Sequence, residues 1–261
     1  MQKKDNVISF RVSDGNSIKL EYHDFLHSTT ELAREYARAG YPDRYAVFAQ
    51  KQTSSILTGT KLGDKEYDKG IFISCILRPS IFPSQAGILG PLSTIAFATA
   101  LEEHTKKKLG ISWIKDIYCD NVKIGGCSIE GKLDDYTSYE YIIITFAARL
   151  DPKNFPPLLT DLVRQVFEDE SQSLGMIMAK TVLNKFFNMY RDLKSPEKHM
   201  DLYRNKFVLV GKNIKYLHGD KKLKGKVIGI DKETTALLVE SKKGEIIKIT
   251  SPSNVIIPNK I

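Results

Sequence analysis

The stretch Val122-Lys123-Ile124-Gly125-Gly126-Cys127-Ser128-Ile129-Glu130 decides the fold, together with the apolar run from Tyr139 to Leu150 that follows it. Both segments have the length and composition of a β-strand, and the polar residues 131–135 between them are typical of a turn, so we expect a hairpin of long strands. Lys123 enters an otherwise apolar strand. Two glycines come next, and a glycine lets another group approach the backbone closely.

The segments before this hairpin predict further strands with a helix packed on them. Strands are expected at 7–12, 18–22, 45–49 and 71–77. A helix begins at Ser28 or Thr29, either of which can cap it, and it ends before Gly40. The polar segment from Lys51 to Gly70 is a predicted loop of about 20 residues, and loops of that length in compact domains are usually functional. It is therefore the first site candidate.

The segments after the strand at 71–77 complete a chain of two parts. Apolar periodicity predicts helices at 92–108, 159–167 and 179–190. Residues 194–199 form the best linker, and the short alternating segments after it, up to Ile257, are typical of a small closed β-barrel. We therefore expect an α/β (α+β) fold with a mixed, mostly antiparallel sheet and flanking helices. Its domains are 1–200 and 201–261.

Composition is that of an ordinary globular chain. It has 261 residues, 42% of them hydrophobic, and a formal net charge of +8. Apolar runs such as Tyr141 to Ile144 are far shorter than the roughly 20 residues that span a bilayer, and the first residues lack the apolar segment of a secretory signal. We therefore expect a cytoplasmic protein with no membrane partner. Cys75, Cys119 and Cys127 lack disulfide or metal spacing, which predicts reduced thiols.

Charge and motif content exclude several kinds of site. The basic residues are scattered, with short clusters at 106–108 and 221–226, so solvated faces explain the charge better than a nucleic acid, and an acidic protein partner also fits. The five histidines lack metal-ligand spacing, and the P-loop and dinucleotide motifs do not occur. We expect no protein-bound metal. Lys123 remains as a compact cation for a phosphate or carboxylate, although an edge-strand lysine beside a bulge gives the same pattern.

Four motifs, in their order along the chain, resemble those of biotin protein ligases. They are His27-Ser28-Thr29-Thr30-Glu31, Ala49-Gln50-Lys51-Gln52-Thr53, Trp113-Ile114-Lys115-Asp116-Ile117-Tyr118 and the stretch from Lys123 to Glu130. Asp116 precedes Lys123 by seven residues, as in the family. Lys224 to Asp231 is similar to the family's terminal barrel of the Src-homology type. The resemblance covers about residues 20 to 257 and implies a ligase body like that of class II synthetases.

The resemblance implies an activity and a role for each residue. Ligases of this family use ATP with Mg²⁺ to convert biotin to biotinyl-5′-AMP, and then pass the acyl group to a lysine of a biotin carboxyl carrier protein. Lys123 would stabilise the charge that develops at the carboxylate and α-phosphate, and Asp116 would orient or deprotonate the acceptor lysine. The biotin-binding residues would be Ser28, Thr29, Thr30, Gln52, Gly125 and Gly126. Helix capping explains Ser28 and Thr29 equally well.

The chain departs from the family where the family holds phosphate. Residues 54–62 replace an arginine-rich glycine loop, and each lost charge-assisted contact costs about 1.5–3 kcal/mol. The phosphate contacts would come from Ser54, Ser55, Gly59 and Lys61, with Lys65 or Lys69 able to compensate. Ser112, Lys115 and the segment 145–149 also differ from the family's pattern. We therefore expect altered ligand recognition.

Two other functions remain open. Because the arginine loop is missing, a ligase-like module could hold biotin or a related acyl ligand without adenylating it. A lipoyl or octanoyl transferase could use Cys127 as its acyl acceptor. For partners, the resemblance implies the carrier protein and allows a homodimer through sheet edges. Fewer than 30 residues precede Ser28, too few for a helix-turn-helix domain, so we expect no nucleic-acid partner.

Overall fold

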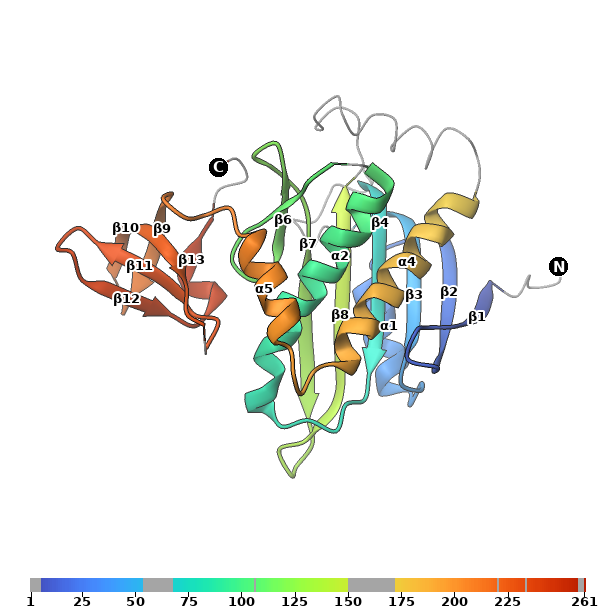
Figure 1. Cartoon of the computed structure of the whole chain (residues 1–261). Helices are drawn as coiled ribbons and strands as arrows, with labels where there is room; N and C mark the ends of the chain where they lie inside the picture. The colour runs from blue at the N-terminus through green and yellow to red at the C-terminus, as the bar shows by residue number, and fades with distance from the viewer. Residues whose placement is uncertain are drawn as a thin grey trace.

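The computed structural model describes residues 6–53, 68–105, 107–149, 172–219, 221–232, 234–257 and 261. Its large sheet has eight strands in the order β1-β2-β3-β4-β8-β7-β6-β5 (Figure 1). These are β1 (Val7–Arg11), β2 (Ser17–Leu26), β3 (Tyr45–Gln52), β4 (Asp68–Leu77), β5 (Gly110–Ile111), β6 (Asp116–Cys119), β7 (Val122–Leu133) and β8 (Tyr139–Arg149). Neighbouring strands are antiparallel except β2 and β3, which are parallel. The mixed, mostly antiparallel sheet is therefore confirmed.

Helices cover both faces of this sheet. The structure describes α1 (Thr29–Arg38), α2 (Leu89–Thr105), α4 (Gln172–Arg191) and α5 (Glu197–Asn205), with a 3-10 turn η1 (Pro83–Ile88) before α2. α1 lies on one face, and α2 and α4 pack together on the other (Figure 1). The Ser28 hydroxyl caps α1 by accepting a hydrogen bond from Glu31 N at 3.3 Å, and Gly40, with a φ of +83°, follows its C-terminal end.

Two apolar cores join these layers. Between the sheet, α2 and α4, the Phe146 ring lies 5.7 Å from the rings of both Phe97 and Phe186, in edge-to-face contact. On the other face, the small side chains of Ala33 and Ala37 let α1 approach the strands closely. Each fully buried large apolar side chain contributes about 1.5–3 kcal/mol. The strands that carry the site are therefore held in a well-packed scaffold.

The C-terminal part forms a second sheet of five strands, in the order β12-β11-β10-β9-β13. They are β9 (Asn213–His218), β10 (Lys221–Ile230), β11 (Leu237–Ser241), β12 (Ile246–Ile249) and β13 (Val255–Ile256), the last preceded by a 3-10 turn η4 (Pro252–Asn254). Trp113 joins the core of this sheet, and its Nε1 donates to Thr235 O at 2.9 Å. The predicted small β module is present, and the domain boundary at residue 200 stays a prediction.

Several strands are longer than predicted, because segments of polar residues at their ends also pair with the neighbouring strand. Lys51 and Gln52 extend β3 and pair with Lys69 and Asp68, so both ends of the predicted loop at 51–70 belong to strands. Similarly, residues 131–133 continue β7 instead of forming a turn. That turn is closed by the carboxylate of Asp134, which accepts hydrogen bonds from two backbone N–H groups at 2.9 and 2.8 Å. Polar residues that pair across strands show no alternation with apolar residues in the sequence. This explains why 51–52 and 131–133 were predicted as loop and turn instead of strand.

The predicted linker at 194–199 is also wrong in part, because α5 begins at Glu197 and runs through the segment expected to start the strands. Residues 208–210 are not a strand, and the helix expected at 92–108 spans Leu89–Thr105. The helix predicted at 159–167 lies outside the described residues. Within the described part of the chain, no helix combines the length and the apolar character needed to cross a bilayer.

Candidate functional site

Lys123 and Asp116 form an ion pair where β6 and β7 meet. Asp116 lies opposite Gly126 in the register, and an irregularity after Ile117 places Lys123 opposite Tyr118. Lys123 Nζ lies 2.7 Å from Asp116 Oδ1, and the two side chains are only 15% and 8% exposed. Removing one partner of a buried pair typically costs about 3–5 kcal/mol, because the other charge is left uncompensated. Lys123 is thus a largely desolvated cation held by a carboxylate.

The pair lines a pocket of about 270 Å³ between the large sheet and the C-terminal segment. Its described lining consists of Trp113, Lys115, Asp116, Lys123, Pro252, Val255, Ile256 and Ile257. Charged groups at one end meet apolar side chains at the other. Such a pocket can receive an anion at its two lysines and an amine at its carboxylate. The described lining does not include Ser28 or Gln52.

A strained turn positions Asp116. Ile114 has a φ of +71°, a left-handed conformation that β-branched residues rarely adopt. Its peptide groups are fixed on both sides, since Tyr203 Oη accepts from Ile114 N at 2.6 Å and Thr94 Oγ1 donates to Ile114 O at 2.5 Å. Such strain costs about 1–3 kcal/mol and persists only where neighbouring groups impose it. Tyr203 on α5 therefore frames the site, a role that the predicted domain boundary at 200 obscured.

Four hydroxyl groups form a buried cluster under the first turn of α1. Thr30 Oγ1 lies 2.9 Å from Thr145 Oγ1 on β8. Ser74 Oγ on β4 lies 2.8 Å from Thr145 Oγ1 and donates to Thr29 Oγ1 at 3.0 Å. All four residues are buried. The sequence motifs identify the two threonines of the helix but miss Ser74 and Thr145, whose only signal is a hydroxyl inside an apolar strand.

Gln52 and Ser28 lie beside this cluster at the N-terminus of α1. Gln52 is fully buried at the end of β3, and its Oε1 accepts a hydrogen bond from Thr29 N at 3.3 Å. Ser28 is buried too, and its hydroxyl is the helix cap described above. The capping interpretation of Ser28 is therefore realised. The structure thus brings the four polar residues that were predicted to bind biotin into one group: Ser28, Thr29, Thr30 and Gln52.

The ion pair and the α1 group lie on the same face of the large sheet. Gly126 and Ser128 are two residues apart on β7 and so share a face. Asp116 lies directly opposite Gly126, and Thr145 lies directly opposite Ser128. Because Thr145 bonds α1, Asp116 faces the same side as that helix. One sheet face thus presents a cation, a carboxylate and a set of hydroxyl and amide groups.

The adjacent glycines Gly125 and Gly126 of β7 serve the chain's own packing. A Cβ at Gly126 would lie 2.4 Å from Lys115 O, and one at Gly125 would lie 2.7 Å from Ala147 O. Real Cβ atoms do not approach oxygen this closely, so each glycine admits a neighbouring strand. A ligand contact at this backbone stays a prediction. Lys115 O also accepts a hydrogen bond from Cys127 N at 2.8 Å, which fixes the turn before Asp116.

Cys127 is poorly suited to nucleophilic chemistry. Its side chain belongs to the core between the sheet and α2, and burial raises the pKa of its thiol well above the usual value. The thiolate is the reactive form, so a buried protonated thiol is inert. This does not favour an acyl acceptor at Cys127. Nearby, the buried Ser112 Oγ has no hydrogen-bond partner among the described residues.

Part of the predicted site cannot be placed. Ser54, Ser55, Gly59 and Lys61 lie outside the described residues, as does Lys65. The backbone of Lys69 belongs to β4. Among the residues that the structure describes, no three His, Cys, Asp or Glu side chains gather where they could hold a metal ion.

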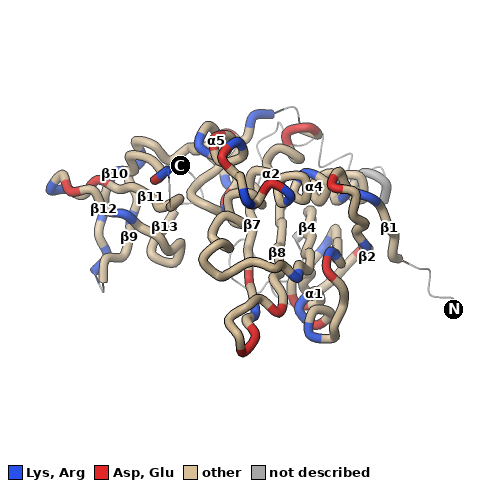
Figure 2. The backbone as a smooth tube through the Cα atoms, turned by 60° about the horizontal axis from the view of Figure 1, so that its bottom comes forward, with Lys and Arg blue, Asp and Glu red and all other residues tan. Residues whose placement is uncertain are grey.

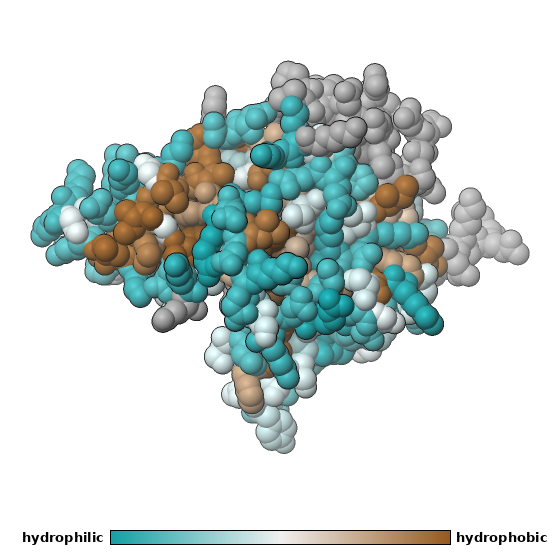
Figure 3. Space-filling view, viewed as in Figure 1, coloured by the Kyte–Doolittle hydropathy of each residue, from teal (hydrophilic) through white to brown (hydrophobic). Residues whose placement is uncertain are grey.

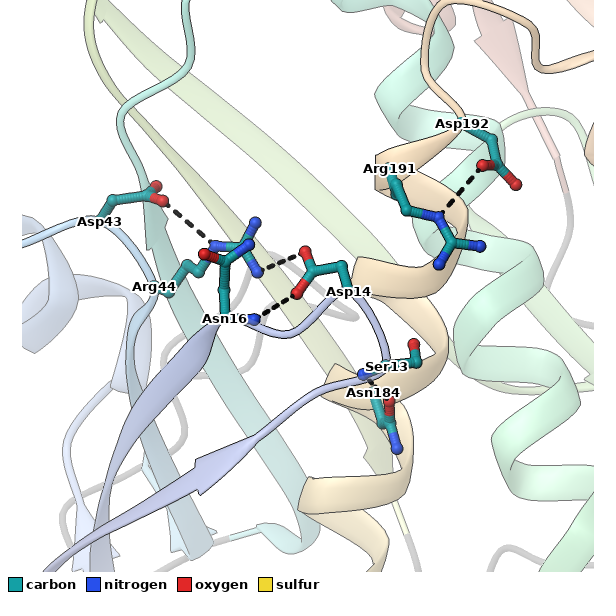
Figure 4. A network of polar contacts seen from close by, with 8 residues as sticks. All are labelled: Ser13, Asp14, Asn16, Asp43, Arg44, Asn184, Arg191 and Asp192. Carbon is teal, nitrogen blue, oxygen red and sulfur yellow. Dashed lines mark hydrogen bonds and ion pairs between the residues drawn. The ribbon is translucent and has the colours of Figure 1, made fainter.

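A hollow of about 1190 Å³ lies at the opposite end of the strands, where β3 begins. Arg44 there pairs with Asp14 at 2.7 Å, and its guanidinium group lies 4.3 Å from the centre of the Phe187 ring. Burial alone would raise the pKa of Asp14, but hydrogen bonds from Asn16 and Arg44 outweigh it and hold that pKa below its usual value. Figure 4 shows this network joining the β1–β2 turn to α4. It contains no predicted site residue.

Comparisons with known proteins find relatives in sequence and in structure. The bifunctional ligase/repressor BirA of Bacillus subtilis is 27% identical over 231 residues, which cover 86% of this chain and 70% of that protein. A biotin protein ligase from Aquifex aeolicus in complex with biotin and ATP matches with a TM-score of 0.64 at 21% identity, covering 89% of this chain and 95% of that chain.

A biotin protein ligase-like protein of unknown function from Silicibacter matches with a TM-score of 0.62 at 14% identity, covering 89% of this chain and 94% of that one. No family model matches the chain. At these identities the structural likeness establishes the fold alone.

Proposed function

We propose that this chain is a biotin protein ligase, which activates biotin with ATP and transfers it to a lysine of a biotin carboxyl carrier protein. The similarity to a curated ligase over 86% of the chain and the shared fold support this function. The observation that carries the proposal is the buried Lys123–Asp116 pair on the same sheet face as the polar group at the start of α1. The two charged groups match the two steps of the reaction.

In the first step Lys123 stabilises developing charge. A carboxylate oxygen of biotin attacks the α-phosphorus of ATP, the bond from that phosphorus to the bridging oxygen breaks, and pyrophosphate leaves. Negative charge grows on the α-phosphate oxygens, and a largely buried ammonium group attracts it more strongly than a solvated one. We assign the remaining phosphate contacts to Ser54, Ser55, Gly59 and Lys61.

In the second step Asp116 receives the acceptor amine. The amine nitrogen attacks the carbonyl carbon of biotinyl-5′-AMP, the bond from that carbon to the phosphate oxygen breaks, AMP leaves, and the nitrogen gives up a proton. When Lys123 turns to the phosphate, Asp116 Oδ1 loses its partner at 2.7 Å and becomes free to orient or deprotonate the amine. The resting ion pair thus holds both side chains at the pocket until substrate binds.

The ureido ring of biotin is assigned to the polar group at the N-terminus of α1. Its members are Ser28, Thr29, Thr30 and Gln52, with Gly125 and Gly126 alongside the ligand. All four polar side chains are buried, so an analogue without the matching ring groups would leave them unpaired and bind more weakly. Thr145 and Ser74 extend this set by holding the two threonines.

The remaining assignments follow from the same function. Mg²⁺ would enter bound to the phosphates of ATP, since the described carboxylates do not form a protein cage for it, and we assign it no step. The acceptor is a carrier protein, and the edge strand β1 of the large sheet could pair in a homodimer, whereas the outer edge of β5 is bonded to residues 206–208. A cytoplasmic location is supported by three buried, unpaired cysteines. The chain divides into a ligase body, 1–200, and a barrel, 201–261.

One experiment separates this enzyme from a binding module. The wild-type protein is incubated with labelled biotin, Mg-ATP and an isolated biotin carboxyl carrier domain, and both pyrophosphate release and labelling of the domain are followed. We expect both products, each dependent on biotin and ATP. Biotin binding that is indifferent to ATP, with no pyrophosphate formed, would instead identify a ligase-like module.

A further inference from the structure

The net charge of the chain is concentrated in its last 55 residues. Residues 207–261 contain 11 lysines, no arginine and 5 carboxylates, so they carry +6 of the formal net charge of +8. Figure 2 shows lysine positions recurring around the small sheet. The short basic cluster at 221–226 is thus part of a charged surface on this module, to which strand pairing adds Lys215.

Four lysines form a ridge on the outward face of β9 and β10. Lys222, Lys224 and Lys226 alternate along β10 on the side away from buried Val227, and Lys215 lies directly opposite Lys224 on β9. All four are exposed, and none forms an ion pair with the described part of the chain. Like charges directly opposite on neighbouring strands destabilise a sheet. Folding alone therefore does not account for Lys215 opposite Lys224, whereas Lys226 lies directly opposite Glu240 on β11.

The ridge is continuous with the candidate site. Lys215 pairs across the strands with Ile256 on β13, and Ile256 also lines the pocket that holds Lys123 and Asp116. Ile256 is 43% exposed, so it joins the pocket to the outer surface. Figure 3 shows apolar surface among the hydrophilic surface of this lobe. A macromolecule whose side chain enters the pocket would lie over Ile256 with the ridge beside it.

We propose that the ridge of Lys215, Lys222, Lys224 and Lys226 docks an acidic face of the protein domain that carries the acceptor lysine. This rests on the proposed function, which requires a protein to bring its lysine to Asp116. Clustered ammonium groups attract carboxylates over distances of about 10 Å at moderate salt and raise the rate of encounter. Apolar Ile256 beside charged residues also resembles the apolar centre and polar rim of a protein interface.

A nucleic acid fits this surface less well than a protein does. Arginine forks and stacked aromatic rings are the side chains that read bases and hold phosphates in a fixed geometry, whereas lysine binds phosphate only as a point charge. Residues 207–261 contain no arginine. The described outward positions of β9 and β10 include no aromatic side chain, since Tyr216 is buried in the core of the small sheet. Lysine, a point charge on a flexible stem, suits loose contacts to carboxylates.

The test compares two triple variants that remove the same charge. The ridge variant combines Lys215→Gln, Lys222→Gln and Lys224→Gln. The control combines Lys19→Gln, Lys194→Gln and Lys232→Gln, three exposed lysines that lie outside β9 and β10. Biotin-dependent pyrophosphate release is measured without acceptor. Transfer to an isolated biotin carboxyl carrier domain of net negative charge is then measured at low and high salt, and its direct binding is followed by fluorescence anisotropy.

We expect the ridge variant to raise the KM for the carrier domain about tenfold at low salt, roughly twofold for each exposed contact, with kcat and pyrophosphate release unchanged. Its KM should also lose most of the salt dependence of the wild type, and the control should behave as the wild type. Equal KM values for the two triples overturn the proposal. So does tight binding of a DNA duplex that only the ridge variant loses. Absence of pyrophosphate from the wild type would refute the ligase function, while anisotropy would still decide the docking.

Discussion

Replacing Thr145 with valine tests the hydroxyl cluster that anchors α1. Valine keeps the shape of threonine and removes its hydroxyl, so Thr30 Oγ1 and Ser74 Oγ lose a partner at 2.9 and 2.8 Å. Ser74 keeps its bond to Thr29, but Thr30 keeps only a 3.5 Å contact to Ser74. Because the site is buried, one polar group is left unsatisfied, and we expect a loss of about 1–3 kcal/mol in the free energy of unfolding.

Urea unfolding followed by fluorescence of the single tryptophan measures this loss. The midpoint should fall while the dependence on urea is unchanged, because the folded state stays compact. Thr145→Ser is the matched control, since it restores the hydroxyl and omits only a methyl group. Biotin titrated by calorimetry should bind more weakly to the valine variant, whose first turn of α1 is less firmly held. Equal midpoints for valine and wild type, or a serine variant as unstable as the valine one, would refute the role of the cluster.

Three further predictions follow from the packing and the pKa directions. In the folded protein the pKa of Asp14 lies below its usual value. The ionised carboxylate therefore stabilises the fold at neutral pH, and this stabilisation is lost when acid protonates it. Asp14→Asn should therefore be less stable in urea at neutral pH, with a gap that closes below about pH 4; a gap that widens in acid contradicts this. Gly126→Ala places a Cβ 2.4 Å from Lys115 O and should cost about 1–3 kcal/mol, visible as a lower midpoint. Burial raises the pKa of Cys127, so a thiol reagent should modify it slowly until urea is added, and rapid modification of the native protein would disprove this.

Local patterns predict the strands and the helix that carry the site. The hairpin of β7 and β8 follows from two strand-like runs with a polar turn between them, and the start of α1 follows from Ser28 as a cap. The family spacing indicated that Lys123 and Asp116 belong to one site but did not predict their ion pair, which the short β6–β7 connection explains physically. Residues near in sequence are thus easily brought together.

Contacts between distant segments could not be predicted in this way. Thr145 meets Thr30 across 115 residues of sequence, and this depends on the register of β8 and on the position of α1 above the sheet. Tyr203 supports Ile114 from a helix that the polar composition of α5 concealed. The lysine ridge appears only when β9 and β10 pair, because that register alone places Lys215 opposite another lysine. A single sequence shows which secondary structure each segment prefers, but not which distant residue each side chain will contact.

The central claim is that the Lys123 ammonium group stabilises the charge formed when biotin is adenylated, and biotin-dependent pyrophosphate release by Lys123→Gln tests it most directly. Glutamine removes the charge while its amide can still reach Asp116. Lys132→Gln on the same strand is the control, because its ammonium group is exposed and pairs with Glu140 at 2.5 Å. We expect release, measured well below the unfolding midpoint that the uncompensated Asp116 lowers, to fall about 10²- to 10³-fold in Lys123→Gln. Release by the control should be unchanged. Release by Lys123→Gln at the wild-type rate would contradict the claim.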